Sequence, residues 1–186
     1  SMRIGIVGAG AAGLAAASVL KVEHDIVVFE QEEKLGGLWN YRDDPEKGAL
    51  YPTLRTNLPR QLMAFWDFPF EDHFPASSGD DFPGHETVLN YLTAFTAHKD
   101  LGSLIRFNTR VKSIQPPDRL ASNWRLVTCR GETELFDAVV IANGHYDQPR
   151  LPAISGVQSF PGTISHSKNY RNPDSFATKR VMIWGA

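Results

Sequence analysis

The chain has 186 residues, of which 42% are hydrophobic, 22% charged and 11% aromatic, and this composition excludes a disordered chain, a collagen-like repeat and a coiled coil. The formal net charge is −2, so no basic excess points to nucleic acid as a partner. No stretch approaches about 18 consecutive apolar residues, and the single cysteine, Cys129, excludes an internal disulfide and a cysteine-rich metal site. We expect an intracellular globular domain that binds no metal.

The N-terminal part of the chain predicts a strand, a helix and a second strand. Arg3–Val7 is a short β-branched run that a glycine closes, and Ala11–Leu20 is rich in alanine with leucine and valine at helical spacing. Residues 25–30 contain a second apolar β-branched run. A strand, a helix and a strand within so short a span form a βαβ unit, which predicts a parallel sheet and the α/β class.

The segment 36–83 is rich in glycine, proline, asparagine and aromatic residues and has no sustained period. The rings of 63–70 need burial, so we expect an ordered segment that covers a cofactor and contains a short helix near 60–64. A helix is expected to open at 83–85, because Val88, Leu89, Leu92 and Phe95 then share one face.

The second half of the chain predicts a β-rich segment followed by a linker. Alternating or apolar runs predict strands at 105–111, 124–129 and 135–142, with a loop at 116–118. Residues 148–161 contain three prolines and are expected to be a linker. The run 181–186 is similar to residues 4–9 and predicts another strand.

A G-x-G-x-x-G motif joins the first predicted strand to the first helix, and its positions are Gly8, Ala9, Gly10, Ala11, Ala12 and Gly13. The first glycine permits a tight turn, the second lets a diphosphate approach the backbone, and the third lets helix and strand pack closely. Free N–H groups and the positive end of the helix dipole then hold the phosphate charge.

Glu30 closes the second strand, 20 residues after Gly10. A carboxylate at this place accepts hydrogen bonds from both ribose hydroxyls of an adenosine and repels a 2′-phosphate. The motif and Glu30 together predict a dinucleotide site. These residues do not distinguish FAD from NAD as its ligand.

Gly36, Gly37, Leu38 and Trp39 follow the second strand and place two glycines and a large ring near the expected diphosphate. At this point the chain resembles the flavin-containing monooxygenase family, and the resemblance extends over essentially the whole chain. Residues 8–13 and Glu30 resemble the FAD fingerprint of that family. Residues 36–39 resemble its second FAD-contacting segment, which implies that Gly37, Leu38 and Trp39 contact FAD.

Three further segments carry the resemblance, and one of them is 63–70, which resembles the family's aromatic continuation. Tyr51 and 54–59 are similar to the family's segment with an asparagine beside the flavin ring, which implies FAD contacts from Thr56, Asn57 and Leu58. Asn57 is then the expected catalytic residue, because its amide offers a donor and an acceptor to flavin-bound peroxide and NADP⁺. Residues 139–145 resemble the strand and turn that return to FAD and imply contacts from Ala142, Asn143 and Gly144, although Asn143 stands where threonine or serine is more usual. Val111 is a further implied contact.

The most specific match is F-x-G-x-x-x-H-x-x-x-Y at 160–170, which resembles the hallmark of N-hydroxylating and related flavin monooxygenases. Baeyer–Villiger enzymes usually carry tryptophan where Tyr170 stands. His166 is expected to order the linker through hydrogen bonds. The run 180–186 resembles the opening of an NADPH-binding domain. The resemblance thus implies a Rossmann-like FAD-binding domain at 1–150, a linker at 151–178 and, at 179–186, the cut-off first strand of that second domain.

The resemblance implies a monooxygenase dependent on FAD and NADPH, similar to N,N-dimethylaniline monooxygenase. In this family molecular oxygen adds at the flavin C4a carbon, and the hydroperoxide oxygenates a soft nitrogen or sulfur of a small amine or sulfide to an N-oxide or S-oxide. The fragment alone is expected to be inactive. The expected location is the cytoplasm or the cytosolic face of the endoplasmic reticulum, with membrane association and a homodimer left open.

Two other functions stay open: a Baeyer–Villiger-type or other class B flavin monooxygenase, and a non-catalytic flavin-binding fragment. A pyridine-nucleotide disulfide oxidoreductase is excluded, because it needs a cysteine pair and the chain has only Cys129. That cysteine is expected to be a small core residue. The five histidines other than His166 show no metal-ligand spacing and are expected at the surface or at caps.

Overall fold

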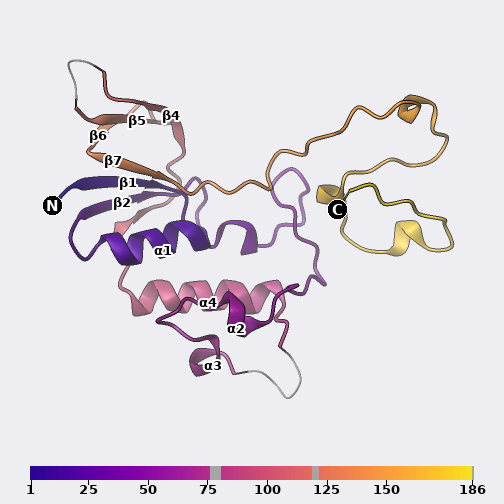
Figure 1. Ribbon diagram of the computed structural model, residues 1–186, viewed down its shortest axis with the longest axis horizontal. Coiled ribbons are helices and arrows are strands. Elements are labelled where there is room, and N and C mark those ends of the chain that lie inside the picture. Colours follow the sequence, from indigo (N-terminus) through magenta and orange to yellow (C-terminus); the bar gives the residue numbers. More distant parts are fainter. Residues whose placement is uncertain (76–80, 119–121, 186) are drawn as a thin grey trace.

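The computed structural model describes residues 1–75, 81–118 and 122–185, and a parallel sheet lies in the body of the protein (Figure 1). Its four strands follow the order β3-β2-β1-β7 and comprise Ile105–Arg106, Asp25–Phe29, Arg3–Val7 and Ala138–Ile141. Helix α1, Ala11–Leu20, connects β1 to β2, which pair in parallel along their whole length. The predicted βαβ unit and the α/β class are confirmed.

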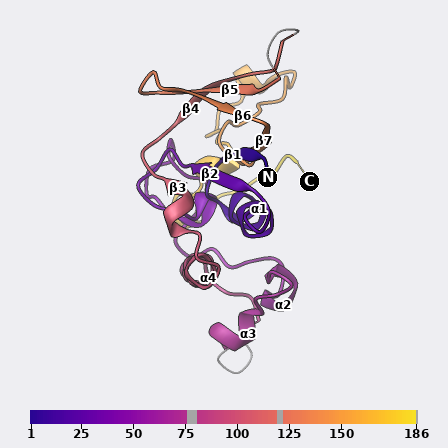
Figure 2. The same ribbon diagram turned by 90° about the vertical axis from the view of Figure 1, so that its left-hand side faces the viewer.

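A second sheet covers one face of the first. Its strands β4 (Val111–Gln115), β5 (Trp124–Thr128) and β6 (Thr133–Phe136) are antiparallel neighbours in that order. Helices α1 and α4 (His85–His98) lie on the opposite face, so the view in Figure 2 shows three layers. The expected β-rich segment is therefore a cover for the parallel sheet.

The period of two along β1 and β2 separates two cores. One set of side chains packs against α1 and α4, and the other set packs against the antiparallel sheet; the first comprises Ile4, Ile6, Ile26 and Val28, and the second Val27 and Phe29 with Leu126 and Phe136. Gly5 lies where the two sheets approach closely, because a Cβ there would meet Leu126 and Phe136 at 3.2 Å. The sheet is buried on both faces, as a parallel sheet requires.

Aromatic packing orders the long connection between β2 and α4. It contains two short helices, α2 (Arg60–Met63) and α3 (Phe70–His73), as the expectation of a helix near 60–64 required. The ring of Tyr91 stacks on Phe70 at 4.0 Å, while its hydroxyl donates to the carbonyl of Phe68 and accepts from the N–H of Phe65. Burial raises the pKa of the Tyr91 hydroxyl, so it stays a donor. The expectation that all the rings of 63–70 are buried is wrong for Trp66, which is 91% exposed.

Two of the predicted strands divide between the two sheets. The run 105–111 breaks after Arg106, where Asn108 takes a left-handed backbone conformation (φ 52°), and Val111 begins β4 in the other sheet. Asparagine tolerates that conformation better than most residues. The run 135–142 breaks at Asp137, which separates β6 from β7. The strand at 124–129 forms as β5, but Cys129 follows its end and is exposed, so its expected place in the core is wrong.

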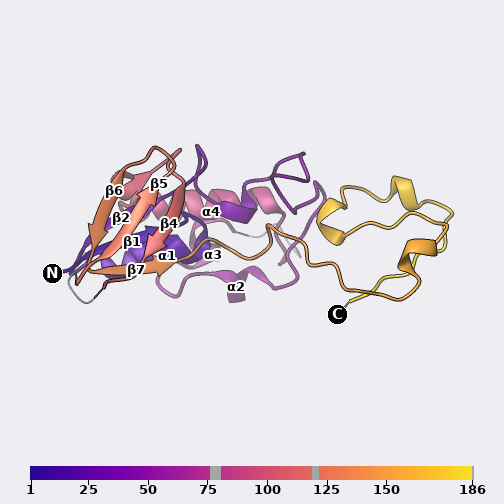
Figure 3. The ribbon, with the colours of Figure 1, turned by 90° about the horizontal axis from the view of Figure 1, so that it is seen from above.

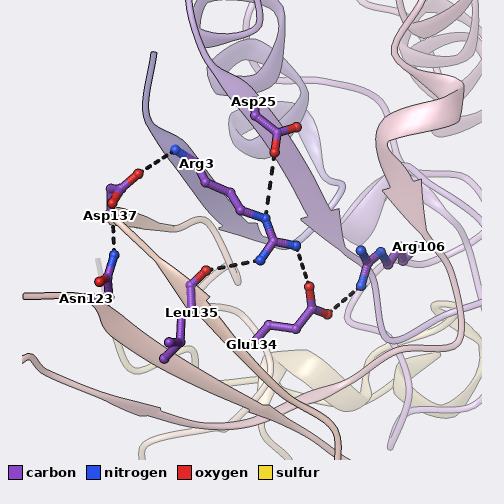
Figure 4. Close-up of polar contacts among 7 residues, drawn as sticks. All are labelled: Arg3, Asp25, Arg106, Asn123, Glu134, Leu135 and Asp137. Atoms are coloured by element: carbon purple, nitrogen blue, oxygen red, sulfur yellow. Dashed lines mark hydrogen bonds and ion pairs between the residues drawn. The ribbon is translucent and has the colours of Figure 1, made fainter. Parts of the chain in front are cut away.

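Arg3 and Asp137 hold the corner at which the chain passes from β6 to β7 (Figure 4). The Asp137 carboxylate accepts from the Arg3 N–H at 2.7 Å, and the Asp137 N–H donates to the Arg3 carbonyl at 2.9 Å. The Arg3 guanidinium reaches Glu134 on β6 at 2.6 Å, and Arg106 donates to the other oxygen of that carboxylate. These contacts tie β1 and β3 of the parallel sheet to β6 of the antiparallel sheet.

After β7 the chain leaves the two sheets, as Figure 3 shows. Across 142–185 the structure has short 3₁₀ turns, η3 (Val157–Ser159), η4 (Ser167–Asn169) and η5 (Asp174–Phe176), and no α-helix or strand. The strand expected at 181–186 is wrong for the described residues 181–185, because a lone segment has no neighbouring strand to pair with. The division at 150 and 178 stays a prediction. Among the described helices, none has the length and apolar character needed to cross a membrane.

Candidate cofactor site

The glycine-rich turn lies between β1 and α1, and its first and third glycines are required by packing. Gly8 has φ +107°, and a Cβ there would lie 2.4 Å from the carbonyl oxygen of Ala142. A Cβ on Gly13 would lie 1.8 Å from the carbonyl oxygen of Gly8. Both positions exclude a side chain before any ligand binds.

The N-terminus of α1 offers unpaired N–H donors. Gly10 is its N-cap in an extended conformation, and within the described residues no side chain caps the helix. The N–H groups of the first turn have no partner inside a helix, and they carry the positive end of its dipole. Ala11 is half-buried and Ala12 is exposed, so an anion can reach this end of the helix.

The second glycine segment faces the first. The N–H of Gly36 donates to the carbonyl of Ala9 at 2.9 Å. A Cβ on Gly37 would lie 3.1 Å from the Cα of Gly10, and a Cβ on Gly10 would lie 3.6 Å from the Cα of Gly37. Backbone without side chains therefore lines both sides of this approach, which fits a diphosphate. Leu38 is exposed beside it, whereas Trp39 is partly buried against the main core.

Glu30 lies next to the glycine-rich turn at the carboxyl end of β2 and is buried. One carboxylate oxygen accepts from the N–H of Ala9 at 2.8 Å, and the other accepts from the N–H of Glu32 at 2.9 Å. A carboxylate has about four acceptor positions, so two lone pairs remain for ribose hydroxyls. The geometry fits the adenosine end of a dinucleotide beside a diphosphate on α1.

Two other predicted segments reach the same edge of the sheet. Ala142 donates its N–H to Val7 at 2.9 Å and lies beside Gly8. The exposed Asn143 and Gly144 follow it. The N–H of Thr109 donates to the Glu30 carbonyl at 2.8 Å, and Val111, two residues further on, packs against the core that contains Val27 and Phe29.

Sequence reasoning missed an open polar pocket beside the loop that follows β2. It has a volume of about 530 Å³ and lies between the loops 32–34 and 40–47, with Asn108 in its wall. Arg42 pairs with Glu32 across it at 2.8 Å, and Asn108 donates its N–H to the Glu32 carbonyl. No motif contains Arg42, so only the fold could have revealed it. No group of three or more metal-ligating side chains occurs in the described parts of the chain.

Asn57 belongs to a separate turn. Thr56 is buried and donates its hydroxyl to the carbonyl of Leu58 at 2.8 Å, whereas Asn57 and Leu58 are exposed. The N–H of Thr56 donates to the carbonyl of Pro83 at 3.0 Å, which fixes the turn to the start of α4. In the part of the chain that the structure describes, the Asn57 amide forms no hydrogen bond.

Comparison with known proteins identifies the family. The chain matches the family "FMO-like: Flavin-binding monooxygenase-like" over residues 1–186. This chain belongs to the flavin-binding monooxygenase-like family. It is 39% identical over 206 aligned positions to "Flavin-containing monooxygenase FMO GS-OX5" of Arabidopsis thaliana, covering 100% of this chain and 44% of that protein.

Solved structures of flavin monooxygenases share the fold. The S-allyl-L-cysteine S-oxygenase from Allium sativum superposes with a TM-score of 0.82 at 36% identity, covering 94% of this chain and 44% of that one. A steroid monooxygenase bound to NADP gives 0.68 at 27% identity, covering 94% and 31%. The chain therefore spans less than half the length of these relatives. FAD and NADPH are the cofactors that this membership indicates, and the individual FAD contacts named above stay predictions.

Proposed function

We propose that the protein carrying this flavin-binding monooxygenase-like chain uses FAD, NADPH and molecular oxygen to oxygenate a soft nitrogen or sulfur atom in a small amine or sulfide. The observation that carries the proposal is the approach of Gly10 and Gly37 beside the buried carboxylate of Glu30. A sulfide is the first substrate to test, because a relative with 36% identity is an S-oxygenase.

The residues divide the work between binding and positioning. The N–H groups at the start of α1 bind the diphosphate, and Glu30 orients the adenosine. Asn57 presents its amide from a turn fixed by Thr56, so a donor and an acceptor are available to the reacting groups. FAD, when bound, supplies the electron transfer and the activation of oxygen.

We also propose a division of labour along the chain. Residues 1–150 bind FAD, and 151–178 link this unit to an NADPH-binding unit that follows in the longer protein. The 186-residue chain is then expected to bind FAD without oxidising NADPH. Comparing the 186-residue chain with the longer protein therefore tests FAD binding separately from NADPH oxidation.

The test uses the longer protein, purified with its flavin. Oxygen-dependent NADPH consumption is measured with an alkyl sulfide, a tertiary amine and a cyclic ketone, and the products are identified by mass spectrometry. The proposal expects an S-oxide or N-oxide in proportion to the NADPH consumed. An ester or lactone from the ketone alone, or a protein that takes up no flavin, would contradict it.

A further inference from the structure

Arg171 joins the C-terminal segment to a loop of the body that lies far away in the sequence. Its guanidinium donates to the carbonyl of Gly48 at 2.8 Å, across 123 positions of sequence. The same group donates to the carbonyls of Lys168 and Tyr170 at 2.9 and 2.8 Å. Figures 1 and 3 show this segment beside the loop after Trp39. One cation thus holds both segments.

This arrangement is unusual for a cation that is half-buried. Among the described residues, no carboxylate pairs with Arg171, and its Nε–H is buried without a hydrogen-bond partner. Burying a charge that has only neutral acceptors costs free energy. The three carbonyls that accept from Arg171 offset part of this cost, so the Arg171 charge favours keeping these carbonyls in place.

Aromatic contacts reinforce the same junction. The ring of Tyr170 meets Tyr51 edge to face at 5.0 Å and lies against Phe176 at 6.0 Å. His166 accepts from the N–H of Lys168 at 3.1 Å and so orders η4, as the sequence predicted. The hallmark motif therefore packs its tyrosine onto the loop that Arg171 holds.

That loop leads directly into the turn of Asn57. The N–H of Leu54 donates to the carbonyl of Tyr51 at 3.0 Å, and Thr56 follows with its hydrogen bond to Pro83. Thr56 thus fixes the turn to the start of α4. The position of the chain that enters the turn depends on Gly48 and Tyr51, which Arg171 and Tyr170 contact.

We propose that Arg171 is a positioning residue, which through Gly48 and Tyr51 holds the Asn57 turn in register with the C-terminal segment. The inference rests on the proposed function, because it concerns the residue expected to position the reacting groups. NADPH consumption then yields either oxygenated product and water or, when register is lost, hydrogen peroxide from the same oxygen. Arg171 determines how this flux divides and leaves FAD binding to the glycine-rich turn.

The test compares Arg171→Ala, Arg171→Lys and the exposed control Arg150→Ala in the longer protein loaded with FAD. We expect Arg171→Ala to raise the peroxide released per NADPH at least threefold, with FAD occupancy unchanged. Lysine can still donate to one or two of the carbonyls, so Arg171→Lys is expected to lie between Arg171→Ala and the unaltered protein. Amide hydrogen exchange over 48–57 is expected to quicken in Arg171→Ala and to stay unchanged across β1 and β2.

Tyr170→Leu provides a second variant if Arg171→Ala does not fold, and we expect the same direction of change with a smaller size. An unchanged peroxide fraction, or a loss of FAD that accounts for the loss of product, would overturn the inference. Should the unaltered protein consume no NADPH, the proposed function fails. Hydrogen exchange over 48–57 in the FAD-loaded chain then decides alone whether Arg171 holds this loop.

Discussion

The carboxylate of Glu30 accepts a hydrogen bond from the N–H of Ala9 at 2.8 Å, although 21 positions separate the two residues. The bond joins the end of β2 to the glycine-rich turn that follows β1. The other carboxylate oxygen accepts from the N–H of Glu32, so one side chain orders the glycine-rich turn and the loop beyond β2. The proposed adenosine contact and the shape of the proposed diphosphate site are therefore coupled through Glu30.

Glu30→Gln should weaken FAD binding by about tenfold to a hundredfold. Glutamine keeps one acceptor oxygen and turns an NH₂ group toward one of the two backbone donors, so a buried N–H loses its partner. Hydrogen bonds to a charged group contribute about 1.5–3 kcal/mol, and 1.4 kcal/mol corresponds to a tenfold change in the dissociation constant. Titration of the chain with FAD, followed by flavin fluorescence, measures the change.

Glu33→Gln is the matched control, because the Glu33 side chain is 72% exposed and its only ion pair is a 3.9 Å contact with Lys34 among the described residues. The dissociation constant for FAD of the Glu33→Gln chain should equal that of the unaltered chain. Equal effects of the two substitutions would show that charge near the site, and not the contacts of Glu30, determines the affinity.

The glycines of the fingerprint should separate into two kinds. Gly13→Ala places a methyl group 1.8 Å from the Gly8 carbonyl oxygen, so the unfolding free energy should fall by about 3 kcal/mol. Gly10→Ala meets only an ordinary contact at 3.6 Å, so the chain should fold normally and lose FAD affinity by about tenfold or more. Urea unfolding and FAD titration distinguish the two.

Gly102→Ala is the control for both, since a Cβ there meets nothing within 4 Å. Its stability should change by no more than about 0.5 kcal/mol. If Gly10→Ala lowers stability as much as Gly13→Ala and leaves FAD affinity intact, the diphosphate does not lie between Gly10 and Gly37.

Local patterns predicted the βαβ unit well, because its strand, turn and helix each have a distinct spacing of residues. They failed where the chain changes sheets. The apolar run along 135–142 looks the same whether the residues belong to one strand or two, and the hydrogen bonds between Asp137 and Arg3 place the break. In 105–111, Asn108 was an available signal, because its φ of 52° is a conformation that asparagine tolerates.

The candidate site shows the same division. The glycine motif, Glu30 and the 36–39 segment were visible because their chemistry depends on short spacings. Arg42 and Arg171 were not, because each acts on a partner that only the fold brings near: Glu32 for Arg42, and Gly48 for Arg171. The prediction that Cys129 lies in the core was wrong because the alternating pattern of β5 was extended by one residue. Cys129 instead begins the exposed turn after that strand.

Asn57→Ala should leave the fold intact and remove oxygenation. Asn57 is exposed and its amide has no hydrogen bond in the described part of the chain, so the unfolding free energy should change by less than about 0.5 kcal/mol. Product formed per NADPH in the longer protein should fall by about tenfold or more, which corresponds to about 1.4 kcal/mol of lost positioning. Asn90→Ala, an exposed asparagine on α4, should change neither quantity.

Glu134 should make the stability of the sheet-to-sheet junction dependent on pH. Burial raises the pKa of Glu134, but hydrogen bonds from Arg3 and Arg106 outweigh it and hold that pKa below its ordinary value of 4.5. The folded chain therefore binds fewer protons than the unfolded chain in this range. The contribution of Glu134 is fully present above about pH 4.5 and is lost as the pH falls through the lowered pKa.

Glu134→Gln should accordingly lower the unfolding free energy at neutral pH by on the order of 1 kcal/mol, and the difference should shrink as the pH falls below about 4. Urea unfolding of both chains at neutral and acid pH measures the difference at each pH. Glu132→Gln, an exposed residue just before β6, should show no such dependence. If the difference in unfolding free energy stays constant with pH, Glu134 stabilises the junction through packing, and the attraction between its charge and those of Arg3 and Arg106 contributes nothing.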